Sequence, residues 1–308
     1  MSNAGTQLDV GRLRLLREVG LRGTIAGAAR SLGLTSSAVS QQLAVLEREA
    51  GVPLVDRSPR GVRLTGAGHA LVTRAQEVID VLISARADLD RISGCVAGPV
   101  ALACVASAAA TFVSAAICGL RESHPGVAVS VLAGEPEQAL ELLVAGDVDL
   151  AVVDEYDYVP LALPDFAVAT ELCVEPLVVL TPVTSAIRAG RHGVALADLS
   201  NESWVMPPDY AACGHAVRSA CRAAGFEPDV RWETDDMLLL VRAVADGHGV
   251  AVLPRLSVAA EHHAGVRVTL LGDPPMTRHL MALARASSLS RPVVSAVLDA
   301  VGAAAARM

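Results

Sequence analysis

The sequence predicts an α/β fold class in three consecutive parts: an N-terminal winged helix-turn-helix, a connecting helix, and a two-subdomain α/β domain. Three observations predict it. Short helical patterns separated by glycine turns open the chain, an apolar repeat averaging 3.5 residues runs over 71–92, and strand and helix patterns alternate after Pro99. We therefore place the parts at residues 1–66, 67–94 and 95–308.

Charge is distributed unevenly along the 308 residues. Residues 1–94 hold 12 arginines against 9 acidic residues, a formal charge of +3, whereas residues 95–308 hold 13 arginines against 24 acids, a charge of −11. A basic N-terminal part, which we call the head, joined to an acidic C-terminal part suggests that the head contacts nucleic acid. No apolar run approaches the roughly 20 residues that span a bilayer, and we expect a cytoplasmic protein without a membrane segment.

Two short helices are predicted before residue 34. The first carries apolar residues at helical spacing and is expected to stop near Gly20 and Gly23, with Leu13, Leu16 and Val19 on its inner face. Thr24 is the expected N-cap of the second helix, and Gly33 its end. Ala28 and Ala29 give that helix a face of small residues, which allows another helix to approach closely.

A third helix follows, with Thr35 as its expected N-cap. Its apolar positions share one face, which must pack inward: Val39, Leu43, Leu46 and Ala50. The start of the opposite face carries short polar side chains: Ser36, Ser37, Ser40 and Gln41. A solvated helix face is the alternative interpretation, but two helices joined by a short turn, the second polar at its tip, favour readout of base edges in a major groove.

A tight hairpin is predicted after the third helix. Arg57, Arg60 and Arg63 lie around Pro59 and Gly61. Arginines on such a wing can neutralise phosphates or enter a minor groove.

The stretch 26–68 resembles the N-terminal signature of LysR-type transcriptional regulators. The resemblance rests on Ala28-Ala29 and Leu32, the Ser-Ala-Val-Ser-Gln run at 37–41, Leu46-Glu47 followed by the Gly-Val-Pro-Leu turn, Asp56-Arg57, and Arg63-Leu64-Thr65 with Gly68. This family usually has phenylalanine at the position of Val55 and often proline at that of Ser37. Neither departure threatens the fold.

The connecting helix carries an apolar stripe with alternating spacings of four and three residues. Its members are Leu71, Ala75, Val78, Leu82, Ala85, Leu89 and Ile92. Packing against its own domain is the alternative, but this repeat favours a partner helix. We expect a homodimer, which would let two heads reach two half-sites of an operator.

The C-terminal part is predicted to begin with a βαβαβ unit that has a parallel sheet. Its strands are expected at 100–106, 127–132 and 149–153, and its helices at 112–122 and 139–145. Further strands are expected at 171–180, 204–206, 231–233, 250–253 and 266–271, with helices at 216–224 and 237–246.

This part resembles the effector-binding domain of the LysR family, which is similar to type II periplasmic binding proteins. The resemblance rests on residues 124–127, 140–151 and 247–254. It implies a cleft between subdomain 1, at about 95–172 plus 269–308, and subdomain 2, at about 173–268. It also implies a dimer of dimers, hence a homotetramer, acting at a promoter, which makes RNA polymerase a further candidate partner.

Ligands in open α/β sheets bind at the carboxyl ends of strands, near helix N-termini. The residues at these positions are our candidates for contact with a small-molecule effector of unknown identity: Ser107, Ala108, Gly134, Glu135, Asp154, Glu155, Met206, Pro207, Thr234 and Asp235. The alternative for Ser107, Thr234 and Asp235 is helix capping. Six acidic residues lie in the same loops, and if they point into the cleft they favour a cationic or amine-bearing effector over a simple carboxylate: Asp154, Glu155, Asp157, Asp209, Asp235 and Asp236. Exposed acids on an acidic surface are the alternative.

Other functional classes fit less well. No zinc-protease, serine-hydrolase or phosphate-loop motif is present, so we expect no enzyme, no cofactor and no metal. A solute-binding protein would suit the C-terminal half, but not the basic head. A redox sensor would need a reactive thiol, and Cys213 and Cys221 lie eight residues apart. Buried, inert thiols are the favoured alternative.

Overall fold

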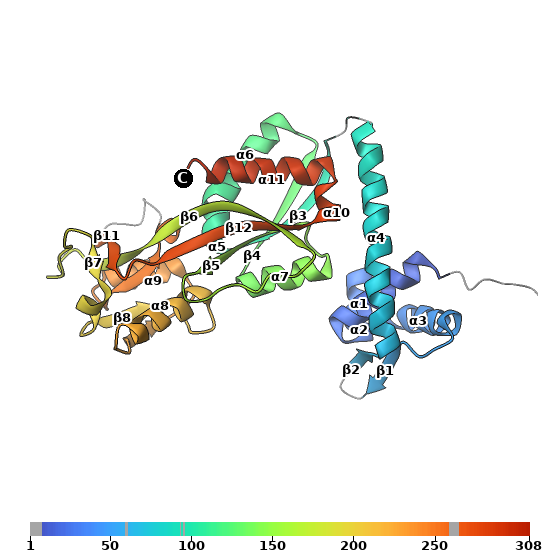
Figure 1. Ribbon diagram of the computed structural model, residues 1–308, viewed down its shortest axis with the longest axis horizontal. Coiled ribbons are helices and arrows are strands. Elements are labelled where there is room, and N and C mark those ends of the chain that lie inside the picture. The colour runs from blue at the N-terminus through green and yellow to red at the C-terminus, as the bar shows by residue number, and fades with distance from the viewer. Residues whose placement is uncertain (1–7, 59–60, 93, 95, 259–264) are drawn as a thin grey trace, which may run out of the picture. The chain divides into compact units, whose positions relative to one another are not determined.

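The computed structural model describes residues 8–58, 61–92, 94, 96–258 and 265–308 (Figure 1). The chain forms two compact units. The first comprises Met1–Cys95 with Ser287–Pro292, and the second comprises Val96–Ala286 with Val293–Met308.

Three helices open the first unit, and their caps explain their limits. They are α1 (Val10–Arg22), α2 (Ile25–Leu32) and α3 (Ser36–Ala50). Thr24 and Thr35 cap α2 and α3 by accepting from the backbone N–H groups of Gly27 and Ala38, which confirms the predicted starts. Of the two glycines near which α1 was expected to stop, Gly23 is confirmed as its left-handed C-cap, whereas Gly20 lies inside the helix, which continues to Arg22.

A hairpin and a long helix complete the first unit. Strands β1 (Val55–Ser58) and β2 (Gly61–Leu64) pair antiparallel, as the predicted wing requires, and α4 runs over Gly66–Ile92. The core of this unit gathers apolar residues from all these elements, among them Leu16, Val39, Leu43, Leu46, Leu54, Val62 and Ala75. Pro59 and Arg60, at the tip of the predicted wing, lie outside the described residues.

The second unit begins with the predicted βαβαβ arrangement. Strands β3 (Gly98–Cys104), β4 (Val127–Ala133) and β5 (Leu150–Tyr156) are parallel, with β3 in the middle. Between β3 and β4 the chain is helical through α5 (Ala106–Ala108), the π-helical η1 (Ala109–Val113) and α6 (Ser114–Ser123). Helix α7 (Pro136–Ala145) joins β4 to β5. The parallel sheet is therefore confirmed.

A long strand connects the two halves of this unit. β6 (Ala167–Pro182) pairs antiparallel with β12 (Thr277–Arg285) along its first part, and with β10 (Ala251–Pro254) and β11 (Val266–Asp273) along its second. Strand β7 (Val194–Ala195) pairs with β11, giving the order β4-β3-β5-β12-β6-β11-β7. The sequence patterns did not predict β12, which lies at the centre of the sheet (Figure 1).

The remaining elements of this unit are a separate two-stranded sheet and further helices. β8 (Ser203–Met206) pairs parallel with β9 (Asp229–Glu233), and α8 (Ala212–Ala223) and α9 (Met237–Ala245) follow those strands. The short helices of this unit include η2 (Leu196–Leu199) and η3 (Arg255–Ser257). Most of α10 (Ala286–Leu289) belongs to the first unit, and α11 (Pro292–Ala305) follows it in the second. Among the described residues, no helix is long and apolar enough to cross a membrane.

Candidate functional site

The first surface with functional chemistry is the start of α3. Val39, Leu43 and Leu46 are fully buried, which turns the opposite face outward. On that face Ser36, Ser37 and Gln41 are exposed, and Ser40 is half-buried. Their hydroxyl and amide groups can donate to and accept from base edges, because such contacts need short polar groups at the tip of a protruding helix.

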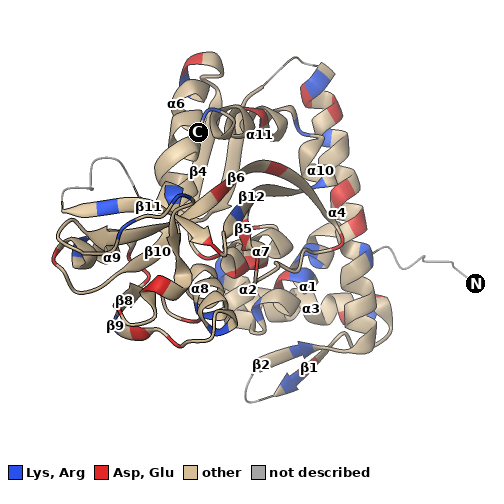
Figure 2. Cartoon of the chain, turned by 60° about the vertical axis from the view of Figure 1, so that its left-hand side comes forward, with Lys and Arg blue, Asp and Glu red and all other residues tan. Residues whose placement is uncertain are grey.

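The hairpin presents basic side chains beside that helix within the same unit. Arg57 on β1 and Arg63 on β2 are both exposed, and Figure 2 shows basic residues on both strands. Glu47 of α3 holds the hairpin in place, because its Oε1 accepts from the backbone N–H groups of Leu54 at 2.9 Å and Val55 at 3.3 Å. The wing is therefore attached to the helix whose tip carries the polar groups.

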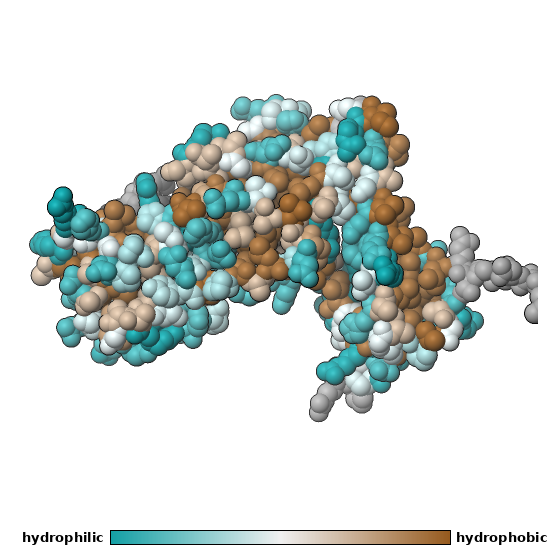
Figure 3. Space-filling view, viewed as in Figure 1, coloured by the Kyte–Doolittle hydropathy of each residue, from teal (hydrophilic) through white to brown (hydrophobic). Residues whose placement is uncertain are grey.

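Helix α4 carries an exposed apolar stripe. Its members are Val78, Leu82, Ala85, Leu89 and Ile92, and apolar side chains follow the helix in Figure 3. Leu82, Leu89 and Ile92 are 44%, 60% and 83% exposed. The two earlier members of the predicted repeat differ, because Ala75 is buried in the core of its own unit and Leu71 packs against that core.

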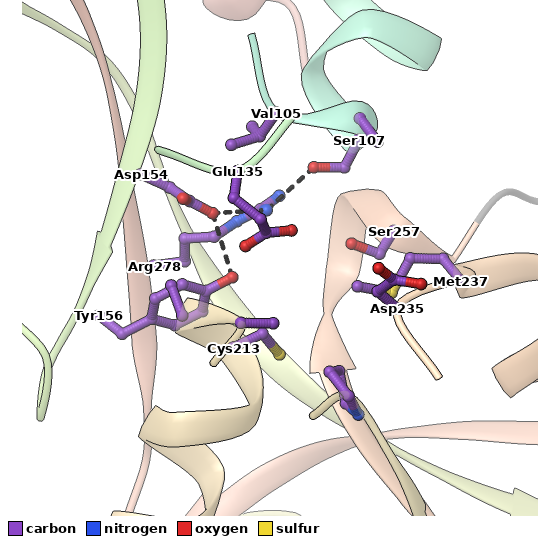
Figure 4. A pocket seen from close by; sticks show the side chains of 14 residues that line it. Val105, Ser107, Glu135, Asp154, Tyr156, Cys213, Asp235, Met237, Ser257 and Arg278 are labelled. Carbon is purple, nitrogen blue, oxygen red and sulfur yellow. Dashed lines mark hydrogen bonds and ion pairs between the residues drawn. The ribbon is translucent and has the colours of Figure 1, made fainter. Parts of the chain in front are cut away.

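The second unit contains a pocket at the carboxyl ends of β3 and β5. Its cavity has a volume of about 60 Å³. Five of the ten sequence-predicted effector residues line it: Ser107, Glu135, Asp154, Pro207 and Asp235. The other described lining residues are Val105, Ala106, Tyr156, Ala211, Ala212, Cys213, Met237, Ser257 and Arg278 (Figure 4).

A buried arginine organises one wall of this pocket. Nη1 of Arg278, on β12, donates to Oδ2 of Asp154 at 3.0 Å and to Oγ of Ser107 at 2.9 Å. Its Nε donates to Oε1 of Glu175 at 2.8 Å, and its Nη2 donates to the same oxygen. Burial opposes the charge of Arg278, yet Tyr156, Asp154 and Glu175 raise its pKa above the ordinary value.

The carboxylates of the pocket influence one another. Burial raises the pKa of Glu135, and the charges of Asp154 and Asp235 raise it further, while the backbone N–H of Ala212 at the start of α8 opposes the shift. The hydroxyl of Tyr156 donates to Oδ2 of Asp154 at 3.1 Å. The described residues contain no group of three or more side chains that could hold a metal ion.

Comparison with known proteins identifies both units. Residues 10–69 match the model of the bacterial regulatory helix-turn-helix protein of the lysR family, and residues 94–306 match that of the LysR substrate binding domain. The chain belongs to the LysR family of transcriptional regulators. It is a DNA-binding transcriptional regulator with an effector-binding domain.

Curated relatives extend over almost the whole regulator. A probable HTH-type transcriptional regulator, LrrA of Synechococcus elongatus, is 30% identical over 95% of this chain and 96% of its own length. The transcriptional dual regulator GltC of Bacillus subtilis is 27% identical over 82% of each chain. These homologues are transcriptional regulators and not enzymes.

Solved structures share the fold of this regulator. A variant of full-length OxyR from Pseudomonas aeruginosa is 21% identical, with a TM-score of 0.72 over 96% of this chain and 95% of that one. Full-length CbnR complexed with its target DNA is 20% identical, with a TM-score of 0.55 over 96% and 99% of the two chains.

Five of the predicted effector residues are not among the described residues that line this pocket. Successive side chains of a strand point to opposite faces, so Glu155 faces away from Asp154 and accepts from the backbone N–H of Leu161. Ala108 and Met206 are fully buried. Gly134 and Thr234 are not among the described lining residues, and Oγ1 of Thr234 accepts from the N–H of Asp236.

The side chain of Asp235 lines the pocket because a different residue caps α9. The N-cap of α9 is Asp236, whose Oδ1 accepts from Leu238 at 2.9 Å and Leu239 at 3.2 Å. The alternative interpretation, that Asp235 caps this helix, is therefore wrong. Ser107 is not an N-cap either, because Val105 occupies that position and the Ser107 hydroxyl accepts from Arg278.

The cysteines of the regulator allow a prediction about redox sensing. Burial raises the pKa of Cys213 and of Cys221 to about 12, and that of Cys104 to about 11, so their thiolates are scarce at neutral pH. Cys118 is exposed. Under native conditions we expect a maleimide to label Cys118 at least ten times faster than Cys213, as read by peptide mass spectrometry, and roughly equal rates after denaturation. Fast native labelling of Cys213 would revive the redox hypothesis.

Proposed function

We propose that this regulator is a homodimer that reads double-stranded DNA with α3 and the wing, and that a small-molecule effector in the Arg278 pocket modulates this binding. The observation that carries the proposal is the combination of an exposed polar tip on α3 with exposed arginines on the hairpin attached to it. DNA binding itself follows from family membership. The residues, the stoichiometry and the pocket are our inference.

Sequence is read by α3 in this proposal. Ser36, Ser37, Ser40 and Gln41 contact base edges, with Gln41 able to pair with an adenine through two hydrogen bonds. Arg57 and Arg63 of the wing bind phosphates, and we assign the same role to Arg60. The CbnR structure was solved with target DNA, which supports a DNA-contacting role for this fold.

Two protomers associate through the apolar stripe of α4, because exposed leucine and isoleucine side chains at this spacing are stabilised by a partner helix. Two such dimers would form the tetramer, and RNA polymerase is the further partner we propose at a promoter. The effector acts by favouring one arrangement of the paired heads, which requires different affinities for the two arrangements. A regulator of chromosomal DNA would work in the cytoplasm.

The test separates base readout from phosphate contact. Duplexes selected from a random-sequence pool with the full chain supply a specific site. Gln41→Ala is expected to lose about 1–3 kcal/mol of preference for that site, with an unchanged salt dependence. The double variant Arg57→Ala, Arg63→Ala is expected to weaken binding to selected and unrelated duplexes alike, and to lower the slope of log affinity against log salt by about 0.9 per lost phosphate contact.

Arg74→Ala is the matched control. This arginine is exposed on α4 and ion-pairs with Glu77, so its loss should leave affinity and salt slope unchanged. If the wing double variant behaves like Arg74→Ala, the wing does not contact DNA. If Gln41→Ala keeps the full preference, α3 does not read the site through this residue.

A further inference from the structure

The charge of the pocket is negative among its described lining residues. Glu135, Asp154 and Asp235 supply three carboxylates, and Arg278 supplies one guanidinium. These side chains come from different elements: Glu135 precedes α7, Asp154 lies on β5 and Asp235 precedes α9. Figure 4 shows the carboxylates of Glu135 and Asp235 on opposite sides of the space that they enclose.

The arginine is already neutralised inside the protein. Four of the five N–H groups of Arg278 are used, two of them on Glu175 and one each on Asp154 and Ser107. Two carboxylates thus face one guanidinium. An entering anion would have to displace a buried ion pair, which is costly because a carboxylate would then lose its partner in a region of low dielectric.

The N-terminus of α8 shares this pocket with an acid. Helix N-termini favour anions because their first N–H groups have no partner in the helix. Here Ala211 and Ala212, at the start of α8, line the same pocket as Glu135, and the backbone of Ala212 lowers the pKa of that carboxyl group. The second feature of the pocket that could attract an anionic ligand therefore already acts on a side chain of the chain itself.

Acceptors in the pocket remain without donors. Asp154 is 4% exposed and lines the cavity, and its Oδ1 has no hydrogen-bond partner. The buried Oγ of Ser257, another lining residue, also has no partner. A buried carboxylate oxygen without a donor is unfavourable, so the site is complementary to a ligand that brings N–H groups.

Tyr210 lies beside one of these acids, Asp235, although it is not among the described lining residues of the pocket. Tyr210 is 72% exposed, and its hydroxyl donates to Oδ2 of Asp235 at 3.3 Å. A tyrosine ring next to carboxylates can attract a cation through its π face. The cavity of about 60 Å³ is far below the roughly 300–1,000 Å³ of sites that enclose drug-sized ligands, so it admits a small head group.

We propose that the effector of this regulator carries an alkylammonium group, which enters the pocket and is bound by Glu135, Asp154 and Asp235. The three N–H donors of a primary ammonium match three acceptors, and the oxygen of Asp154 that lacks a donor receives one of them. This inference rests on the proposed effector role of the pocket and specifies its ligand class.

The test compares propylammonium chloride with sodium propionate, which have similar size and opposite charge. At equal millimolar concentrations, we expect propylammonium to raise the midpoint of thermal unfolding of the full chain and propionate to leave it unchanged. Glu135→Gln and Asp235→Asn should each weaken propylammonium binding roughly tenfold in calorimetric titration. Glu141→Gln, which removes the same charge from an exposed position of α7, should have no effect.

Each outcome decides the ligand class separately from the regulatory role. A shift with propionate, a shift with neither compound, or full binding by the Glu135 and Asp235 variants overturns the alkylammonium assignment. DNA affinity of the full chain, measured with and without each compound, tests the regulatory role. If propylammonium binds but leaves DNA affinity and footprint unchanged, the ligand class holds and the effector role fails. If propionate alters DNA binding, the effector role holds and the ligand class fails.

Discussion

Replacing Arg278 with leucine is expected to lower the free energy of unfolding of the α/β domain by about 3–5 kcal/mol. The guanidinium lies between Asp154 and Glu175, whose side chains are only 5% and 7% exposed. Leucine fills part of the volume but leaves two buried carboxylates without their counter-ion, which costs more than a missing surface contact. Both tryptophans, Trp204 and Trp232, lie in this unit, so fluorescence during urea unfolding reports on this domain alone.

The control for Arg278→Leu is Arg242→Leu on α9. Arg242 is 73% exposed and donates to Asp246 at 2.8 Å, so its loss should cost at most about 0.5 kcal/mol. Adding Asp154→Leu to the Arg278 variant should restore part of the stability, because it removes one uncompensated charge. If Arg278→Leu is as stable as Arg242→Leu, the buried ion pairs do not hold this wall of the pocket.

The N-terminal unit could be predicted from sequence because its signals are local. Thr24 and Thr35 lie three residues before the N–H groups that they accept from, and Gly33 ends α2 in a left-handed conformation. Gly20 was misleading for a tertiary reason. It lies inside α1, where a Cβ would approach Cδ1 of Leu64 to 2.6 Å, so glycine at this position leaves room for a side chain of the hairpin and does not end the helix.

The second unit was predictable where strands follow one another closely. The parallel pairing of β3, β4 and β5 follows from strand and helix alternation, whereas β12 pairs with β5, a strand that ends about 120 residues earlier. The sequence pattern of a short stretch does not indicate a pairing strand so distant along the chain. Arg278, which organises one wall of the pocket, lies on β12. It was not predicted as a pocket residue because its strand was not predicted.

The pocket residues were predictable only as strand ends, and this explains the partial success. A predicted strand end selects two neighbouring residues as candidates. Because successive side chains of a strand point to opposite faces, only one of the two can point toward the pocket. Asp154 and Glu155 show this division. The acidic character of the site was evident from the sequence. In the structure Arg278, the arginine among the described lining residues, ion-pairs with Asp154 and Glu175, and the start of α8 lines the pocket together with Glu135.

The double variant Leu82→Asp, Leu89→Asp places two aspartates in the apolar stripe of α4. We expect it to weaken self-association at least about 100-fold. Both leucines are exposed in the single chain, so the substitutions should leave the fold of each protomer intact. In a dimer paired along α4 they would bury four uncompensated charges in an apolar contact. Sedimentation should then show monomers at concentrations where the unmodified chain is oligomeric, and binding to a two-half-site duplex should fall more than binding to one half-site.

The matched control adds the same charges to α4 outside the stripe. Ala70 and Thr73 are exposed, and Ala70→Asp with Thr73→Asp should leave the sedimentation profile unchanged. Equal association by the stripe variant and this control would mean that α4 does not hold the protomers together. Ala75 is buried in the core of its own unit, so Ala75→Asp should instead unfold the N-terminal unit. The start of the apolar repeat would then be shown to stabilise the protomer, and its later part to hold two protomers together.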